Sequence, residues 1–487
     1  MKKLASLVAF LFISYSAFAQ EYPTGLEFSK EKYEQVLESA PILMRSYTSL
    51  PSSYSLKAYA PTPGNQGAQP SCVGWASGYG ARTIAYAIKN NWRYNTSKIN
   101  QNTFSPSFVY NQIKFKGDYN CKRGSYIADA MKLIKNNGIL KLNQFNYNQK
   151  SCTSTPSSYL MKNAKRNTIY SFERLSKWGD QSNSFVRKVK KAISEKNPVV
   201  IGMNIKKSFY RAKGYWNTYG SQSIGGHAMV VVGYDDNKYG GAFEILNSWG
   251  TLWGNSGYIW VKYSDFKMYT NSTFVMVDNV VKPIVVKDDD NIKDNVVTTS
   301  KISGEITLRL GNGKNMIPTL SNEAKRGFGI VKSTKTTYSI NQVYTSGTQF
   351  RIYLKSKQRG YVYLIGYGSA DKSVSKLYPF ESYSDFFNYT NSEIAIPNED
   401  YFIEFDNKPG RDILCVLYSK EKLNINSIIS KAKYGSGDFV QRIKSALQYK
   451  MFKGDDLTFS NDKIAFSASS KSASAKVVPI FIQMNHQ

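Results

Sequence analysis

The stretch "NQGAQPSCVGWA", residues 65–76, places a thiol, Cys72, six positions after Gln66 and among small residues. Residues 71–89 that contain it have the pattern of a helix, with glycine and alanine where another element could approach closely. The start of a helix favours an anion, because the aligned peptide dipoles leave partial positive charge there. Cys72 is therefore either a nucleophile activated at a helix start or a small buried residue.

A histidine is the partner that could activate such a thiol. A free thiol is mostly protonated at neutral pH unless a nearby cation or helix start stabilises the thiolate. The sequence holds only two histidines, His227 and His486, and the second lies beside the C-terminus. His227 is therefore the candidate base for Cys72.

A third polar residue, Asn247, follows His227 by 20 positions. His227 enters the apolar strand pattern "HAMVVVGYDD", and Asn247 ends the next one, "GAFEILNSW". If these strands form an adjacent antiparallel pair, the Asn247 amide can lie beside the imidazole and fix its orientation. The sequence thus predicts a constellation in the chain order Cys, His, Asn.

These motifs resemble the papain family of cysteine peptidases over about residues 50–280. The most specific match is the run "NSWGTLWGNSGY" that starts at Asn247. The resemblance implies an α+β fold of two lobes, a helical left lobe with Cys72 and a β-barrel-like right lobe with His227 and Asn247. It also implies that the amide of Gln66 and the backbone N–H of Cys72 bind the oxyanion.

The same resemblance gives candidate substrate-binding residues. The backbone at Gly124 and Ser125 takes the place of the glycine pair that holds extended substrate in the family. Gly226 is expected either to open the pocket for the second residue upstream of the scissile bond or to form a plain tight turn. Trp249 is expected to shield the His–Asn hydrogen bond, or to belong to the core.

Two residues depart from the family pattern. Val73 stands where the family has tryptophan, and Gln69 stands where it has the cysteine of a disulfide across the cleft floor. That bridge cannot form, so we expect Cys121 to pair with Cys152. This leaves Cys415 in the apolar run "DILCVLYS", where a free cysteine usually acts as a small hydrophobe.

The chain divides into five segments by composition and pattern. Its 487 residues allow more than one core. The expected segments are a signal peptide (1–19), a short pro-segment or N-terminal extension (20–50), the papain-like domain (51–283), a polar linker (284–300) and a β-rich accessory domain (301–487).

The N-terminus has the features of a secretory signal peptide. Two lysines precede an apolar run that ends in the small-residue pattern Ala17–Phe18–Ala19. The run is short for a bilayer span. We expect cleavage between Ala19 and Gln20, a secreted, periplasmic or cell-surface protein, and no transmembrane segment after cleavage.

The positive charge is large but dispersed. The formal net charge is +29, yet the lysines do not cluster in a nucleic-acid-reading module. We therefore expect no specific nucleic-acid partner, while an acidic surface or polyanion remains a salt-sensitive possibility. The sequence has no metal-ligand cluster in its C-terminal part, and neither a metal nor another cofactor is expected.

The C-terminal part is mostly of strand pattern, with one helix predicted over 425–450. It resembles, more weakly, a poorly characterised β-rich domain that follows papain-like peptidases in secreted bacterial proteins. The spacing predicts a small β-sandwich or barrel.

Two functions follow as hypotheses. The first is a secreted cysteine endopeptidase that hydrolyses proteins or peptides. The second is a papain-like binding or surface-interaction protein with a weak or inactive catalytic site.

Overall fold

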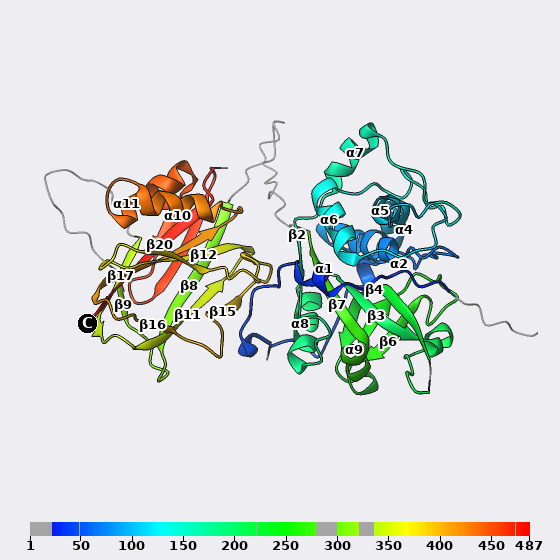
Figure 1. Ribbon diagram of the computed structural model, residues 1–487, viewed down its shortest axis with the longest axis horizontal. Coiled ribbons are helices and arrows are strands. Elements are labelled where there is room, and N and C mark those ends of the chain that lie inside the picture. Colours follow the sequence, from blue (N-terminus) through cyan, green and yellow to red (C-terminus); the bar gives the residue numbers. More distant parts are fainter. Residues whose placement is uncertain (1–21, 48, 221, 279–299, 321–335, 473) are drawn as a thin grey trace, which may run out of the picture.

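The computed structural model describes residues 22–47, 49–220, 222–278, 300–320, 336–472 and 474–487 (Figure 1). The predicted signal peptide and all but the last residue of the predicted linker lie outside these ranges. In the described parts of the chain, no helix is both long and apolar enough to cross a bilayer.

A helical lobe forms the first part of residues 51–283. The predicted helix over 71–89 is confirmed as one continuous run whose middle is wound as a π-helix. Gly74 allows this helix to pack closely, since a Cβ there would lie 2.6 Å from the Pro106 carbonyl oxygen. The lobe contains α2 (Cys72–Gly74), η3 (Trp75–Arg82), α3 (Thr83–Lys89), α4 (Thr96–Gln101), α5 (Pro106–Ile113), α6 (Ile127–Asn137) and α7 (Ser158–Ala164).

A second lobe is built on a sheet of order β2-β7-β3-β4-β5-β6, with β1 paired to β4. β4 and β5 are adjacent and antiparallel, with Val230 opposite Leu246, which confirms the predicted strand pair. The elements are β1 (Ser53–Ser55), β2 (Ser171–Arg174), α8 (Asn183–Ser194), β3 (Val199–Lys206), β4 (Ser223–Asp235), β5 (Ala242–Leu246), β6 (Tyr258–Lys262), α9 (Tyr263–Tyr269) and β7 (Thr270–Val277).

Two sheets pack face to face in the C-terminal part, as a sandwich. One has the order β13-β12-β17-β20-β10-β9 with β14 beside β12, and the other β15-β11-β8-β19-β18 with β16 beside β11. The strands are β8 (Ser300–Leu310), β9 (Pro318–Leu320), β10 (Thr337–Tyr344), β11 (Gln349–Ser356), β12 (Gly360–Tyr367), β13 (Val374–Tyr378), β14 (Phe386–Phe387), β15 (Ser392–Ile396), β16 (Ile403–Glu404), β17 (Gly410–Ser419), β18 (Leu457–Phe459), β19 (Ile464–Ser470) and β20 (Val477–His486).

The prediction of a single helix over 425–450 is wrong. The segment forms two helices, α10 (Ile425–Tyr434) and α11 (Phe439–Leu447). Gly437 between them has φ +90°, which a helix cannot accommodate, and Asp438 then caps α11 with its side chain.

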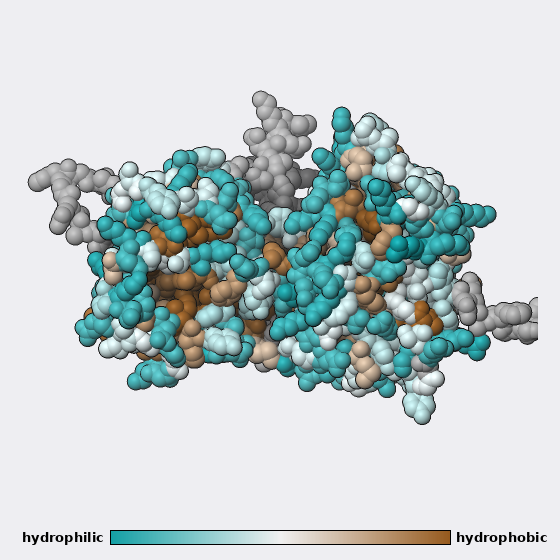
Figure 2. All heavy atoms as spheres, viewed as in Figure 1, coloured by the Kyte–Doolittle hydropathy of each residue, from teal (hydrophilic) through white to brown (hydrophobic). Residues whose placement is uncertain are grey.

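The N-terminal segment joins all three parts. After the short helix α1 (Lys30–Glu34) it is mainly extended, and Figure 1 shows it in dark blue, running between the two lobes and then toward β15. We call residues 22–45 the strap. In Figure 2 this face of the molecule is mainly hydrophilic over the lobes, with broader hydrophobic areas over the C-terminal sandwich.

Candidate active site

Cys72 lies at the start of α2 and is fully buried. Its Sγ accepts a hydrogen bond of 3.4 Å from the backbone N–H of Ala228, the residue after His227. The helical run over residues 72–89 packs against β4, and this brings the Cys72 thiol beside His227.

His227 and Asn247 are in direct contact. His227 Nε2 lies 2.7 Å from Asn247 Oδ1, and that oxygen also accepts a 2.8 Å hydrogen bond from the Ser248 N–H. An oxygen acceptor requires that Nε2 carry the hydrogen, which leaves Nδ1 to exchange a proton. The Trp249 ring lies 4.8 Å from the imidazole and covers it.

Burial keeps the thiol and the imidazole neutral. It raises the pKa of Cys72 to about 12, against weaker opposing effects from the N–H groups of Ala228, Val73 and Gly25. It lowers the pKa of His227 to about 4, although the bond to Asn247 acts in the opposite direction. Loss of solvent disfavours both charged forms while the strap covers the pair.

Gln66 is held by a partner on each end of its amide. Its Oε1 accepts a 2.7 Å hydrogen bond from Ser248 Oγ. Its Nε2 donates to the carbonyl oxygens of Gln69 and Pro23, both at 3.0 Å. The side-chain N–H is therefore aimed at a peptide carbonyl of the strap.

The strap continues along the cleft as an extended strand. The N–H of Leu26 donates to the Gly226 carbonyl at 3.2 Å. Ser125 bonds the strap in both directions, donating to Gly25 and accepting from Glu27, each at 3.0 Å, in a parallel bridge. Residues predicted to bind substrate backbone thus bind the backbone of this chain.

Contacts between the strap and the cleft are close. A Cβ on Gly25 would lie 2.0 Å from the Pro70 carbonyl oxygen, and a Cβ on Gly124 would lie 2.5 Å from the Gly25 oxygen. Further along, Tyr22 stacks on Trp249 with ring centroids 4.6 Å apart. Beside Leu26 and Phe28 the remaining hollow is only about 20 Å³. The cleft is filled.

The cysteines away from the site have different partners. Cys121 and Cys152 form a disulfide with Cα atoms 5.8 Å apart, and Cys415 is buried as a free thiol. Gln69 donates to the carbonyl oxygens of Asn148 and Ser151, the residues that lead to Cys152. Gln69 cannot form a disulfide, but hydrogen bonds from its side-chain amide link the Cys72 loop to residues 148–151.

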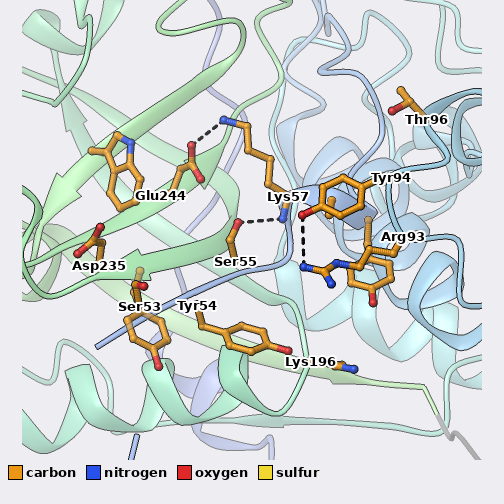
Figure 3. Close-up of a pocket in the computed structure, with 14 residues that line it drawn as sticks. Ser53, Tyr54, Ser55, Lys57, Arg93, Tyr94, Thr96, Lys196, Asp235 and Glu244 are labelled. Carbon is orange, nitrogen blue, oxygen red and sulfur yellow. Dashed lines mark hydrogen bonds and ion pairs between the residues drawn. The ribbon is translucent and has the colours of Figure 1, made fainter. Parts of the chain in front are cut away.

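A larger hollow has a different lining from this site. The described residues contain no group of three metal-ligating side chains. A hollow of about 800 Å³ opens between β1 and residues 93–96, with the Lys57–Glu244 ion pair at its wall (Figure 3). None of the residues that line it is a cysteine or a histidine.

Sequence reasoning missed two parts of the site. Ser248, which orients Gln66, was within the quoted "NSWG" run but had no assigned role. No pattern in the sequence predicts that residues 22–28 occupy the cleft, because "YPTGLEF" has neither helix nor strand periodicity.

Comparisons with known proteins agree with this architecture. Residues 64–277 match the model of the papain family cysteine protease, and residues 343–422 match a domain of unknown function named DUF4384. An uncharacterized peptidase C1-like protein of Acanthamoeba polyphaga mimivirus is 26% identical over 51% of this chain and 78% of its own length. A cysteine protease of Blomia tropicalis is 25% identical over 49% of this chain and 68% of its own.

Among solved structures, xylellain, a cysteine protease from Xylella fastidiosa, aligns over 53% of this chain and 96% of its own. It has 21% sequence identity to this chain and a TM-score of 0.44.

Proposed function

Residues 64–277 form a papain family cysteine protease domain, and on this premise we propose that the chain is a secreted cysteine endopeptidase whose own strap keeps it latent. The observation that carries the proposal is the 2.7 Å contact between His227 and Asn247 beside the buried thiol of Cys72. The substrates are proteins or peptides.

The proposed reaction begins when the cleft is free and solvated. Cys72 transfers its proton to Nδ1 of His227, and the thiolate attacks a peptide carbonyl. The side-chain amide of Gln66 and the backbone N–H of Cys72 stabilise the oxyanion. The imidazolium gives its proton to the leaving amine as the C–N bond breaks, and water, deprotonated by His227, then releases the acyl group and restores the thiol. Asn247 keeps the imidazole in the required tautomer.

The direction of the strap explains why it inhibits without being cut. In a substrate, the residue bound at Ser125 and Gly226 precedes the residue whose carbonyl meets Gln66. In the strap the order is opposite, because Leu26 pairs with Ser125 while Pro23, earlier in the chain, offers its carbonyl to Gln66. A reversed peptide fills the site but presents the acyl and amine sides of its bonds the wrong way round.

Secretion is supported by two independent features. The first 19 residues have the pattern of a signal peptide. The Cys121–Cys152 disulfide is of a kind that persists in oxidising compartments.

A papain-like binding protein with a weak or inactive site is the second candidate, and burial, which raises the pKa of Cys72 and lowers that of His227, favours it. The two functions differ in what an uncovered thiol does. In a chain whose cleft is opened by Gly25→Leu, we would measure hydrolysis of a denatured protein library and labelling by an epoxysuccinyl reagent, with Cys72 intact beside Cys72→Ala. Hydrolysis lost in Cys72→Ala supports the peptidase, whereas equal hydrolysis in the two chains overturns it.

A further inference from the structure

The strap does not end at the catalytic domain. Residues 37–39 lie between β2 of the catalytic domain and a loop of the C-terminal sandwich. On one side Ser39 donates to the Arg174 carbonyl at 2.9 Å, and on the other Glu38 exchanges 2.8 Å backbone hydrogen bonds with Ser382 and Ser384. The strap is therefore a shared strand between the two domains.

The side chain of Glu38 strengthens this junction by ion pairs with residues of the papain-like domain. Its carboxylate is almost fully buried and lies 2.6 Å from Arg174 Nη1 and 2.8 Å from Lys188 Nζ. A buried carboxylate with two cationic partners is costly to separate from them, because either charge would be left without compensation. Glu38 thus belongs to the contacts that hold the strap at the junction of the two domains.

Beyond Glu38 the strap passes onto the sandwich. Ile42 forms a bridge with Ile394 of β15, and the Leu43 N–H donates to the Glu393 carbonyl at 2.9 Å. The Leu43 side chain is 2% exposed and packs against Tyr353 and Ala395. Residues 42 and 43 therefore pair with the β15 edge of the sandwich and bury an apolar side chain there.

Polar contacts hold the next two strap residues to the same edge. The Met44 N–H donates to Glu399 Oε2 at 2.9 Å, and Arg45 Nη2 lies 2.5 Å from Glu393 Oε2. Each of these partners belongs to the C-terminal sandwich. Four consecutive strap residues, 42–45, thus bind it.

From these contacts we propose a function for the C-terminal sandwich: it is the anchor that keeps the strap in the cleft. Ordering an extended segment costs roughly 1–2 kcal/mol per residue in backbone entropy. The sandwich offsets part of that cost by binding residues 38–45. The inference rests on the proposed function only in calling the covered state latent.

The test compares two leucines of the strap in the full chain. Leu43 is buried on the sandwich, whereas Leu37 is 38% exposed on the same segment. We would prepare Leu43→Asp and Leu37→Asp, each in a Cys72→Ser background to prevent self-cleavage. Hydrogen exchange would be measured at the amides of residues 25–27, which bond to Gly226 and Ser125.

We expect Leu43→Asp to speed exchange at residues 25–27 by at least about fivefold, because local opening becomes more frequent, and Leu37→Asp to leave it within about twofold. Equal exchange in the two variants would overturn the anchor. If Leu43→Asp does not fold, Arg45→Glu serves in its place. Its faster exchange should return toward wild type in Arg45→Glu/Glu393→Arg, and no acceleration, or no rescue, overturns the anchor.

The same substitutions with Cys72 intact separate this inference from the peptidase. Faster strap exchange with faster hydrolysis supports both. Faster exchange without hydrolysis supports the anchor and contradicts the peptidase. Hydrolysis that depends on Cys72, with unchanged strap exchange, contradicts the anchor alone.

Discussion

The carbonyl oxygen of Pro23 accepts a 3.0 Å hydrogen bond from the side-chain amide of Gln66. A residue of the N-terminal segment therefore engages the group to which we assign oxyanion binding. The cleft and its occupant belong to one chain, and variants of either should change the access of reagents to Cys72.

Gly25→Leu should open the cleft. A Cβ at residue 25 would lie 2.0 Å from the Pro70 carbonyl oxygen, and backbone atoms cannot yield as a flexible side chain can. We expect epoxysuccinyl labelling of Cys72 to rise about tenfold or more as the open population grows. Glu31→Leu, on the exposed side of α1, is the control and should label at the wild-type rate. Wild-type labelling in Gly25→Leu would mean that the strap does not limit access.

Ser248→Ala should impair catalysis more than binding. Without its hydroxyl, Gln66 Oε1 loses its 2.7 Å donor, and the amide is less well oriented. In a chain already opened by Gly25→Leu, we expect kcat to fall about tenfold with little change in KM, less than the roughly 100-fold or greater loss from removing an oxyanion donor itself.

Alkylation supplies the control for Ser248→Ala. Reaction of Cys72 with iodoacetamide needs no oxyanion donor, so its rate should not change. A matching fall in alkylation would show a general disturbance of the site instead.

Glu173→Gln should change how stability depends on pH. Burial, mainly, raises the pKa of Glu173 to about 7, where Ser39 Oγ and Asn388 Nδ2 donate to its carboxyl group. The folded chain therefore binds this proton more tightly than the unfolded chain. The contribution of Glu173 to stability is full below pH 4.5 and is lost as pH rises from there through 7.

Glutamine cannot ionise, so Glu173→Gln should gain stability relative to wild type by roughly 2–3 kcal/mol between pH 5 and pH 8. Thermal unfolding of both chains across that range measures the gain. Glu34→Gln, at an exposed glutamate, is the control and should show a constant difference from wild type. The same constant difference in Glu173→Gln would contradict the prediction.

Loss of the Cys121–Cys152 bridge should lower stability without touching the catalytic residues. The two cysteines are 31 residues apart, and closing a loop of this length stabilises a fold by about 3–4 kcal/mol on the chain-entropy account. Dithiothreitol should therefore lower the unfolding midpoint of the wild type but not that of Cys121→Ser/Cys152→Ser. Equal sensitivity in the two chains would be inconsistent with a stabilising bridge.

Local patterns in the sequence were enough to single out Cys72, His227 and Asn247, and the resemblance to the papain family predicted the two lobes. Helix and strand periodicity placed each on an element, and the β4–β5 pairing followed from two neighbouring apolar runs. The break at Gly437 was missed because the helical pattern resumes directly after it. A single glycine within such a pattern is a weak signal.

The path of the strap could not be predicted for a different reason. Tyr22, Gly25 and Leu43 bind residues that are distant in the sequence, and no local pattern carries such information. What fixes the strap is the shape of surfaces that exist only after both domains have folded.

The hydrogen bond from the Met44 N–H to Glu399 joins residues that are 355 positions apart in the sequence. At synthesis rates of about 5–20 residues per second, the first of these residues emerges roughly 20–70 s before the second. During translation, the catalytic domain is thus complete while the β15 edge has yet to be made. On the anchor that we propose, the residues that hold the strap are made after the cleft, so a nascent chain has an interval in which its cleft is least restrained.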